Sequence, residues 1–121
     1  MKILVVDDSS AMRKIVVRTL RQAGFQNHEY VEADNGHTGL QAVTDNTPDL
    51  ILSDWNMPEM DGITFLEQLK ERGNTIPFGF ITTEGTVQMR QKASAAGADF
   101  LLQKPFTPEQ IEQTVGQFIK N

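Results

Sequence analysis

The chain has 121 residues, of which 39% are hydrophobic and 22% charged, with a formal net charge of -5 at pH 7 and no cysteine. That length predicts a single domain, residues 1–121, with a core of ordinary size. The lack of cysteine excludes disulfides and thiolate metal sites and fits a reducing, cytoplasmic compartment, while the acidic balance argues against binding to nucleic acid or to an anionic membrane.

The first part of the chain predicts a buried strand and an amphipathic helix. Residues 3–6 are apolar throughout, and the run is too short for a signal peptide or a membrane span. Ser9 or Ser10 can cap the helix that follows, and Gly24 ends it. The apolar residues of this helix that recur at helical spacing are Met12, Ile15, Val16, Leu20 and Ala23.

The middle of the chain predicts two more strand–helix units. Residues 30–33 form a less apolar strand that we expect near an edge of the sheet, and a short helix carrying Leu40 and Val43 follows it. The strand at 50–53 begins with three apolar residues without alternation, which is typical of a strand covered on both faces. It stops abruptly at Asp54, and a carboxylate in that position lies where open α/β sheets place their ligands.

The third helix begins near Asp61 and stops at Arg72, followed by a glycine. Its inward residues are Ile63, Leu66 and Leu69. Strands are then expected at 78–82 and 100–103, on either side of a helix from about 86 to 96 whose apolar stripe is weak.

The last helix has the clearest start in the chain. Thr107 can cap it, Pro108 suits its first position, and Gln110 completes a capping box. Its inward residues are Ile111, Val115, Phe118 and Ile119. Five strand–helix units in strict alternation predict an α/β fold: a doubly wound, five-stranded parallel sheet with right-handed crossovers, flanked by five helices.

Such a sheet gathers the polar residues that follow its strands at one edge. They are Asp7, Asp8, Asp54, Thr82, Thr83 and Lys104. Three carboxylates at one edge repel one another unless they share a proton or a cation, and hard oxygen ligands favour Mg²⁺. We expect Asp8 and Asp54 as direct ligands, Asp7 as a ligand through water, and the backbone carbonyl of Asn56 as a further one.

The alternative for Asp7 and Asp8 is a pair of acidic residues that favour the dipole at a helix start. The third strand-end aspartate and the strand-end Lys104 favour the metal site over that interpretation. Asp54 can also act as a nucleophile, as carboxylates do in forming aspartyl-phosphates. Lys104 and the hydroxyl of Thr82 would then hold phosphoryl oxygens. Taken alone, Lys104 could be a solvated surface residue and Thr82 an ordinary strand residue.

The chain resembles the response-regulator receiver domains, and within that family the receivers that serve chemotaxis. The segments that carry the resemblance span nearly the whole chain in the family's order. They are Val6-Asp7-Asp8 with Ser10-Ala11-Met12-Arg13, Asp54-Trp55-Asn56-Met57-Pro58 with Met60-Asp61-Gly62, Ile81-Thr82-Thr83-Glu84, and Gly97-Ala98 with Lys104-Pro105-Phe106.

The resemblance implies a flavodoxin-like fold with strand order 2-1-3-4-5. It also implies phosphorylation of Asp54 by a histidine kinase, with Mg²⁺ bound by the Asp7–Asp8 pair. Thr82 and Lys104 would form the switch pair, and the Lys104–Pro105 peptide bond would be cis. Such a protein catalyses only its own phosphorylation and dephosphorylation, so it is not an enzyme in the usual sense.

Four further residues are expected around the phosphoryl group of such a receiver. Asn56 and Glu84 flank it and influence how fast water removes it, which leads us to expect a short-lived phosphate. Trp55 and Thr83 lie beside them in sequence and are expected in the same site, with the Trp55 ring packed over it.

One position departs from the family's pattern. Receivers carry an aromatic residue three positions before the lysine, which turns inward when the threonine moves, and here that residue is Leu101. The expected partner surface is the fourth helix, fifth strand and fifth helix, including Gln88, Lys92, Leu101 and Gln103. A flagellar switch protein is one possible partner of this surface, and the chain is expected to be a monomer.

Two other functions stay open on the sequence. The first is a shuttle that passes its phosphoryl group to a histidine phosphotransfer protein in a phosphorelay. The second is a small Mg²⁺-dependent phosphatase of the haloacid-dehalogenase type, which would also use a strand-end aspartate. Those enzymes usually carry a second aspartate two residues on, where this chain has Asn56.

Overall fold

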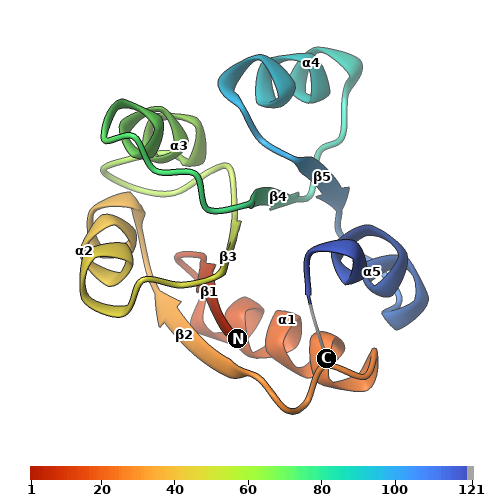
Figure 1. Cartoon of the computed structure of the whole chain (residues 1–121). Helices are drawn as coiled ribbons and strands as arrows, with labels where there is room; N and C mark the ends of the chain where they lie inside the picture. The colour runs from red at the N-terminus through yellow and green to blue at the C-terminus, as the bar shows by residue number, and fades with distance from the viewer. Residues whose placement is uncertain (120–121) are drawn as a thin grey trace.

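The computed structural model describes residues 1–119 and confirms the predicted sheet. Five parallel strands lie side by side in the order β2-β1-β3-β4-β5 (Figure 1). The strands are β1 (Lys2–Val6), β2 (Glu29–Ala33), β3 (Leu50–Ser53), β4 (Phe78–Thr82) and β5 (Phe100–Gln103). The helices are α1 (Ser10–Gln22), α2 (Gly36–Asn46), α3 (Gly62–Glu71), α4 (Val87–Ala96) and α5 (Pro108–Val115), with a 3-10 turn η1 at Gly116–Phe118. Within residues 1–119, none of these helices has the length and apolar character that crossing a bilayer requires.

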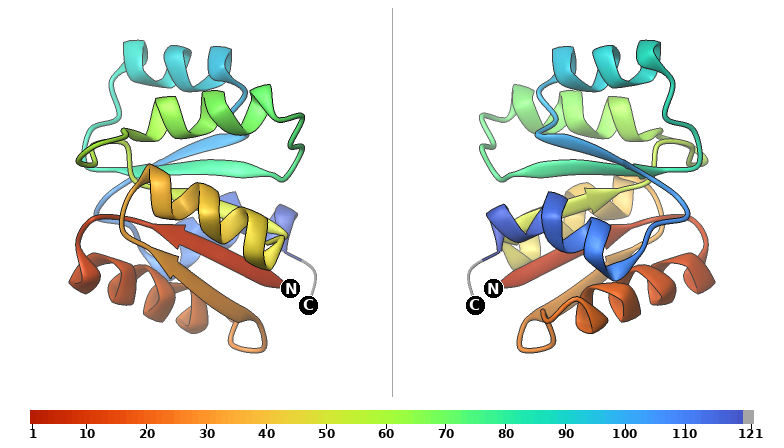
Figure 2. Two further views of the ribbon diagram at one scale, coloured as in Figure 1. Left: turned by 90° about the vertical axis from the view of Figure 1, so that its left-hand side faces the viewer. Right: turned by 90° about the vertical axis from the view of Figure 1, so that its right-hand side faces the viewer.

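Helices cover both faces of the sheet, which accounts for the apolar character of its central strands. Figure 2 shows α1 and α5 on one face and α2, α3 and α4 on the other. The buried side chains divide into two clusters accordingly, one on each side of the sheet. Every residue of β3 and β4 is buried, whereas β2 and β5 lie at the two edges and are more exposed. The expectation that residues 30–33 lie near an edge is therefore confirmed.

Each helix begins with a side-chain cap directly after the loop that leaves the preceding strand. The capping residues are Ser9, Asn35, Asp61, Thr86 and Thr107. Ser9 rather than Ser10 caps α1, because its Oγ accepts a hydrogen bond from the Met12 N–H at 3.2 Å. Short capped loops keep the carboxyl ends of the strands and the amino ends of the helices together at one edge of the sheet.

The prediction for the inward face of α1 is wrong at Ile15, which is 47% exposed. Val17 and Thr19 are buried instead, together with the predicted Val16 and Leu20. An apolar stripe is wider than the contact a helix makes with a sheet, so a residue at its margin can lie outside the core. Ile15 lies beside Pro105 and Phe106 in a surface groove.

Two further differences concern α3 and α5. Phe65 was not expected in the core, yet it is fully buried and packs edge-on against Phe78. The last α-helix ends at Val115, so Phe118 belongs to η1 and is only half-buried, while Ile119 is buried as expected. Phe118 packs against Phe100 at a ring separation of 5.4 Å.

Candidate functional site

The register of the two central strands brings Asp7 and Asp54 together. Val6 of β1 pairs with Ser53 of β3, so the next residue of each strand is an aspartate at the same edge. The backbone fixes both positions, because the Asp54 N–H donates to the Val6 carbonyl at 2.8 Å and the Asp7 N–H donates to the Ala33 carbonyl at 3.1 Å. The predicted convergence of strand ends is therefore present in the fold.

The three predicted carboxylates form one cluster. Each of Asp7, Asp8 and Asp54 offers an oxygen that lies within 4.8 Å of the others. Asp7 is 4% exposed, Asp54 is partly buried, and Asp8 is open to solvent. An oxygen-only donor set with one solvent-facing member suits Mg²⁺, which keeps several of its waters when it binds to protein.

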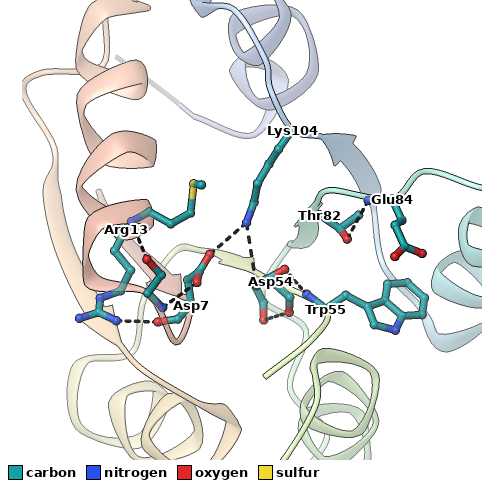
Figure 3. Close-up of polar contacts among 10 residues, drawn as sticks. Asp7, Arg13, Asp54, Trp55, Thr82, Glu84 and Lys104 are labelled. Atoms are coloured by element: carbon teal, nitrogen blue, oxygen red, sulfur yellow. Dashed lines mark hydrogen bonds and ion pairs between the residues drawn. The ribbon is translucent and has the colours of Figure 1, made fainter. Parts of the chain in front are cut away.

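Lys104 supplies the positive charge of the site. Its Nζ lies 3.1 Å from Asp7 Oδ2 and 3.8 Å from Asp54 Oδ2, and its side chain is only 9% exposed (Figure 3). Its backbone is anchored to β4, because its N–H donates to the Thr82 carbonyl at 2.7 Å. The Lys104–Pro105 bond is cis, as the resemblance implied. A buried ammonium between two carboxylates is not the solvated surface lysine of the alternative interpretation.

The carboxylate of Asp54 is oriented by a hydrogen bond, and its pKa is raised. Its Oδ1 accepts a hydrogen bond of 2.7 Å from the Trp55 N–H. Burial raises the pKa of Asp54 above its ordinary value, and the negative charges of Asp7 and Asp8 raise it further. The Lys104 ammonium and the Trp55 N–H act in the opposite direction, since both favour the charged form.

The remaining predicted residues surround this centre at different depths. Trp55 contacts Asp54 through its backbone, while its indole ring packs against Phe80 with 4.8 Å between ring centroids. Figure 3 shows that ring pointing away from Asp54, so the expectation that it covers the site is wrong. Thr82 is fully buried, and its Oγ1 accepts from the Glu84 N–H at 3.4 Å.

Three expected neighbours of the phosphoryl group, Asn56, Thr83 and Glu84, are exposed. The Thr83 carbonyl accepts a hydrogen bond from the Gln103 side chain at 3.3 Å, which ties the loop after β4 to β5. The roles of these three residues, and of the Asn56 carbonyl as a metal ligand, stay predictions.

Leu101, the residue that departs from the family's pattern, lies in β5. It packs against the cluster on the face of α2, α3 and α4, whereas its neighbour Phe100 packs against the opposite cluster. Its carbonyl accepts a hydrogen bond from Arg90 Nη1 at 3.2 Å, which joins α4 to β5. The side chain is half-buried, so it contributes to the surface formed by α4, β5 and α5.

Arg13 belongs to the site but received no role from the sequence. Its Nη1 donates to the Asp7 carbonyl at 2.5 Å and its Nε donates to Glu32 Oε1 at 2.9 Å (Figure 3 shows the first contact). One signal could have found it. The first turn of α1 has no acidic residue, and an arginine close to a helix amino end is unfavourable to the dipole unless other groups hold it.

The five-stranded parallel sheet and the polar cluster at the carboxyl ends of its strands define a class of protein. Comparison with known proteins gives the same class. Residues 3–116 match the family model described as the response regulator receiver domain, and the chain belongs to that family. Its members are signalling proteins.

Within the family, the chain is similar to proteins named for chemotaxis. It is 38% identical over 117 residues to the chemotaxis protein CheY of Pseudomonas aeruginosa, covering 95% of this chain and 93% of that protein. It is 37% identical over 122 residues to CheY-3 of Vibrio cholerae, with 99% and 92% covered. The solved structure of Vibrio cholerae CheY4 superposes with a TM-score of 0.86 at 33% identity and covers 98% of both chains.

Proposed function

We propose that this receiver domain is a phosphorylation switch of two-component signalling, most closely of the chemotaxis type, that acts in the cytoplasm as a monomer. A histidine kinase would phosphorylate Asp54, and the phosphorylated form would change protein binding at the surface of α4, β5 and α5. The observation that carries the proposal is the convergence of Asp54 with Asp7, Asp8 and Lys104 at one edge of the sheet.

The transfer requires an oriented nucleophile and compensation of charge. An oxygen of Asp54 forms the new bond to phosphorus as the bond from phosphorus to the kinase's histidine nitrogen breaks, and that electron pair leaves with the imidazole. The Trp55 N–H holds one oxygen of Asp54, and Lys104 lies beside the other. Asp7, Asp8 and Asp54, with the Asn56 carbonyl, would hold Mg²⁺, which neutralises charge on the phosphoryl oxygens when it is bound.

The output would use residues that link the site to the far surface. Thr82 is buried directly before the loop that leads into α4, so movement of its hydroxyl toward a phosphoryl group would also move that loop. Gln103 and Arg90 tie the same region to β5. The surface beyond contains a hollow of about 370 Å³ whose walls come from α4, β5 and α5. Phosphorylation would shift the population of conformations that this surface adopts.

This surface would bind the output protein, with a flagellar switch component as one candidate. Gln88, Lys92 and Gln103 are exposed on it. Leu101 lacks the ring and hydroxyl that an aromatic residue would present there, so the choice of partner depends on the surrounding polar residues. The exposed positions of Asn56 and Glu84 leave the acyl phosphate open to water, and we infer that it is short-lived.

Labelling with acetyl phosphate and Mg²⁺ tests the proposal. We expect one phosphoryl group per chain, on Asp54, measured by intact mass and peptide mapping after rapid quenching. Sustained turnover of many phosphoesters would instead support the phosphatase of the haloacid-dehalogenase type. A long-lived phosphate that returns to a histidine phosphotransfer protein would support the relay shuttle.

An apolar groove beside the site suits the docking of the phosphohistidine-bearing domain of the kinase. The groove measures about 340 Å³, and Lys104 is among the residues that line it. The other lining residues are Met12, Ile15 and Thr19 of α1, Thr83 after β4, and Pro105 and Phe106 after β5. Because Ile15 is 47% exposed, covering it would gain hydrophobic free energy at the point where the donor histidine must approach.

Replacing Ile15 by glutamine is expected to slow phosphotransfer from a histidine kinase roughly ten-fold, the effect of losing the burial of part of one apolar side chain. Labelling by acetyl phosphate should not change, because that donor needs no docking surface. The matched control is Val87→Gln, which removes the other large exposed apolar side chain of residues 1–119, 67% exposed on α4. Equal slowing with both donors, or equal slowing in the control, would contradict the assignment of the groove.

A further inference from the structure

Arg13 joins three elements at the candidate metal site. It extends from α1, donates through Nη1 to the carbonyl of Asp7 at the end of β1, and donates through Nε to Glu32 of β2. The ion pair with Glu32 has a separation of 2.9 Å, and the Arg13 side chain is 15% exposed. A guanidinium has a planar, rigid set of donors, so two simultaneous contacts fix its position more firmly than a flexible ammonium could.

The contact with the Asp7 carbonyl bears on two proposed ligands at once. That carbonyl belongs to the planar peptide unit that joins Asp7 to Asp8, so holding it restrains the backbone from which both carboxylates project. The other polar groups of Asp7 are also held: its N–H by the Ala33 carbonyl, its Oδ1 by the Ser9 N–H at 2.9 Å, and its Oδ2 by Lys104 at 3.1 Å. With the Arg13 contact, each polar group of Asp7 has a hydrogen-bond partner. The same contact restrains the backbone of Asp8 through the shared peptide unit.

We propose that Arg13, anchored by Glu32, is a positioning residue that sets the geometry of the Asp7–Asp8 pair for Mg²⁺. The inference rests on the proposed function, in which these carboxylates hold the ion. Groups that orient metal ligands without touching the metal commonly change its affinity by about ten-fold or more when they are replaced. Mg²⁺ demands near-ideal octahedral geometry, whereas Ca²⁺ accepts flexible coordination. Loss of positioning should therefore weaken Mg²⁺ binding more than Ca²⁺ binding.

The ratio of the two affinities separates positioning from charge. Arg13 is a cation bonded to the backbone of Asp7, one of the proposed ligands, so removing its charge alone would strengthen the binding of any divalent ion. Arg13→Lys keeps the positive charge and removes the planar, rigid set of donors, which makes it the informative variant. A purely electrostatic role would move the affinities for Mg²⁺ and Ca²⁺ together, since both ions carry the same charge.

The experiment is calorimetric titration of wild type, Arg13→Lys and Glu32→Gln with MgCl₂ and separately with CaCl₂. We expect Arg13→Lys to raise the Kd for Mg²⁺ roughly ten-fold and the Kd for Ca²⁺ clearly less. Glu32→Gln should also raise the Kd values for Mg²⁺ and Ca²⁺, by smaller factors than Arg13→Lys does. In this variant Arg13 keeps its bond to the Asp7 carbonyl and loses only its ion pair with Glu32. Arg18→Lys, an exposed position on the same helix, is the matched control and should leave both affinities unchanged. Urea unfolding of each variant verifies that the titrated protein is folded.

The outcomes distinguish the two levels of the proposal. If wild type binds no Mg²⁺, the proposed function fails and the inference falls with it. If wild type binds Mg²⁺ and Arg13→Lys binds it equally well, the inference alone is overturned. Equal weakening of Mg²⁺ and Ca²⁺ in a folded Arg13→Lys protein also overturns it, because that result shows no loss of ligand geometry.

Discussion

An Asp54→Asn variant is expected to take up no phosphoryl group from acetyl phosphate or from a histidine kinase. The amide has no anionic oxygen to attack phosphorus, so the nucleophile that the Trp55 N–H orients is lost. Intact mass after incubation with Mg²⁺ and acetyl phosphate measures the loss. Full labelling of the variant would show that another residue is the acceptor and would overturn the assignment of Asp54.

The same substitution should stabilise the fold at neutral pH by about 1 kcal/mol, because it removes a charge that burial and the neighbouring carboxylates disfavour. Burial is the main cause of the raised pKa of Asp54, so the folded state binds its proton more tightly than the unfolded state does. The contribution of Asp54 to stability is therefore fully present below its unfolded pKa and is lost as the pH rises through its folded pKa. The variant has no such group, and its advantage over wild type should grow as the pH rises through that window.

Denaturant unfolding of both proteins over a range of acidic to neutral pH checks this dependence. Asp45→Asn is the matched control, because it makes the same change of charge at an exposed position on α2. A stability difference between Asp54→Asn and wild type that stays constant or shrinks as the pH rises would contradict the shifted pKa of Asp54.

Much of this site was predictable because it depends on strand ends. A parallel sheet places the residue after each strand at one edge, so the apolar runs before Asp7, Asp54 and Lys104 were enough to bring the three side chains together. The resemblance to receivers added the strand order and the cis bond before Pro105, and the structure has both.

Features that depend on side-chain reach were not predictable in the same way. Helical spacing placed Ile15 on the apolar stripe, but its exposure depends on how far Pro105 and Phe106 extend beside α1. The indole of Trp55 packs against the buried ring of Phe80, a contact that depends on the position of β4 and not on the residues next to Trp55 in sequence. Arg13 reaches Asp7 and Glu32 across two strands, and no local pattern encodes a contact that depends on the spacing between α1 and the sheet.

Gly62 is a second determinant of the geometry at Asp54, and its role is steric. It is the first residue of α3, directly after the cap Asp61, and its N–H donates to the Trp55 carbonyl at 2.8 Å. A Cβ at this position would collide with the Asp54 carbonyl and would lie 2.7 Å from the ring of Phe80 and 3.1 Å from the Trp55 Cα. Two of these neighbours are backbone atoms and the third is a fully buried ring, so none can yield without moving the segment that carries Asp54.

Gly62→Ala is therefore expected to lower the free energy of unfolding by about 3 kcal/mol, at the upper end of what overpacking usually costs. A domain of ordinary stability stays folded after such a loss, so its chemistry can still be measured. Labelling by acetyl phosphate should slow by a factor on the order of 100, because Asp54 is displaced from Lys104 and from the acidic pair. Urea unfolding and the rate of labelling measure the two effects on the same protein.

Gly116→Ala is the matched control for that substitution. Its φ is -58°, an ordinary helical value, and the nearest atom to a Cβ there is the Phe25 Cζ at 3.6 Å, a normal contact. The control should be neutral or slightly stabilising, since alanine favours the helical conformation over glycine, and its labelling rate should equal that of wild type. If Gly62→Ala matched this control in stability and rate, the backbone around Asp54 would be free to adjust, and the position of the nucleophile would have to depend on the acidic pair and Lys104 instead.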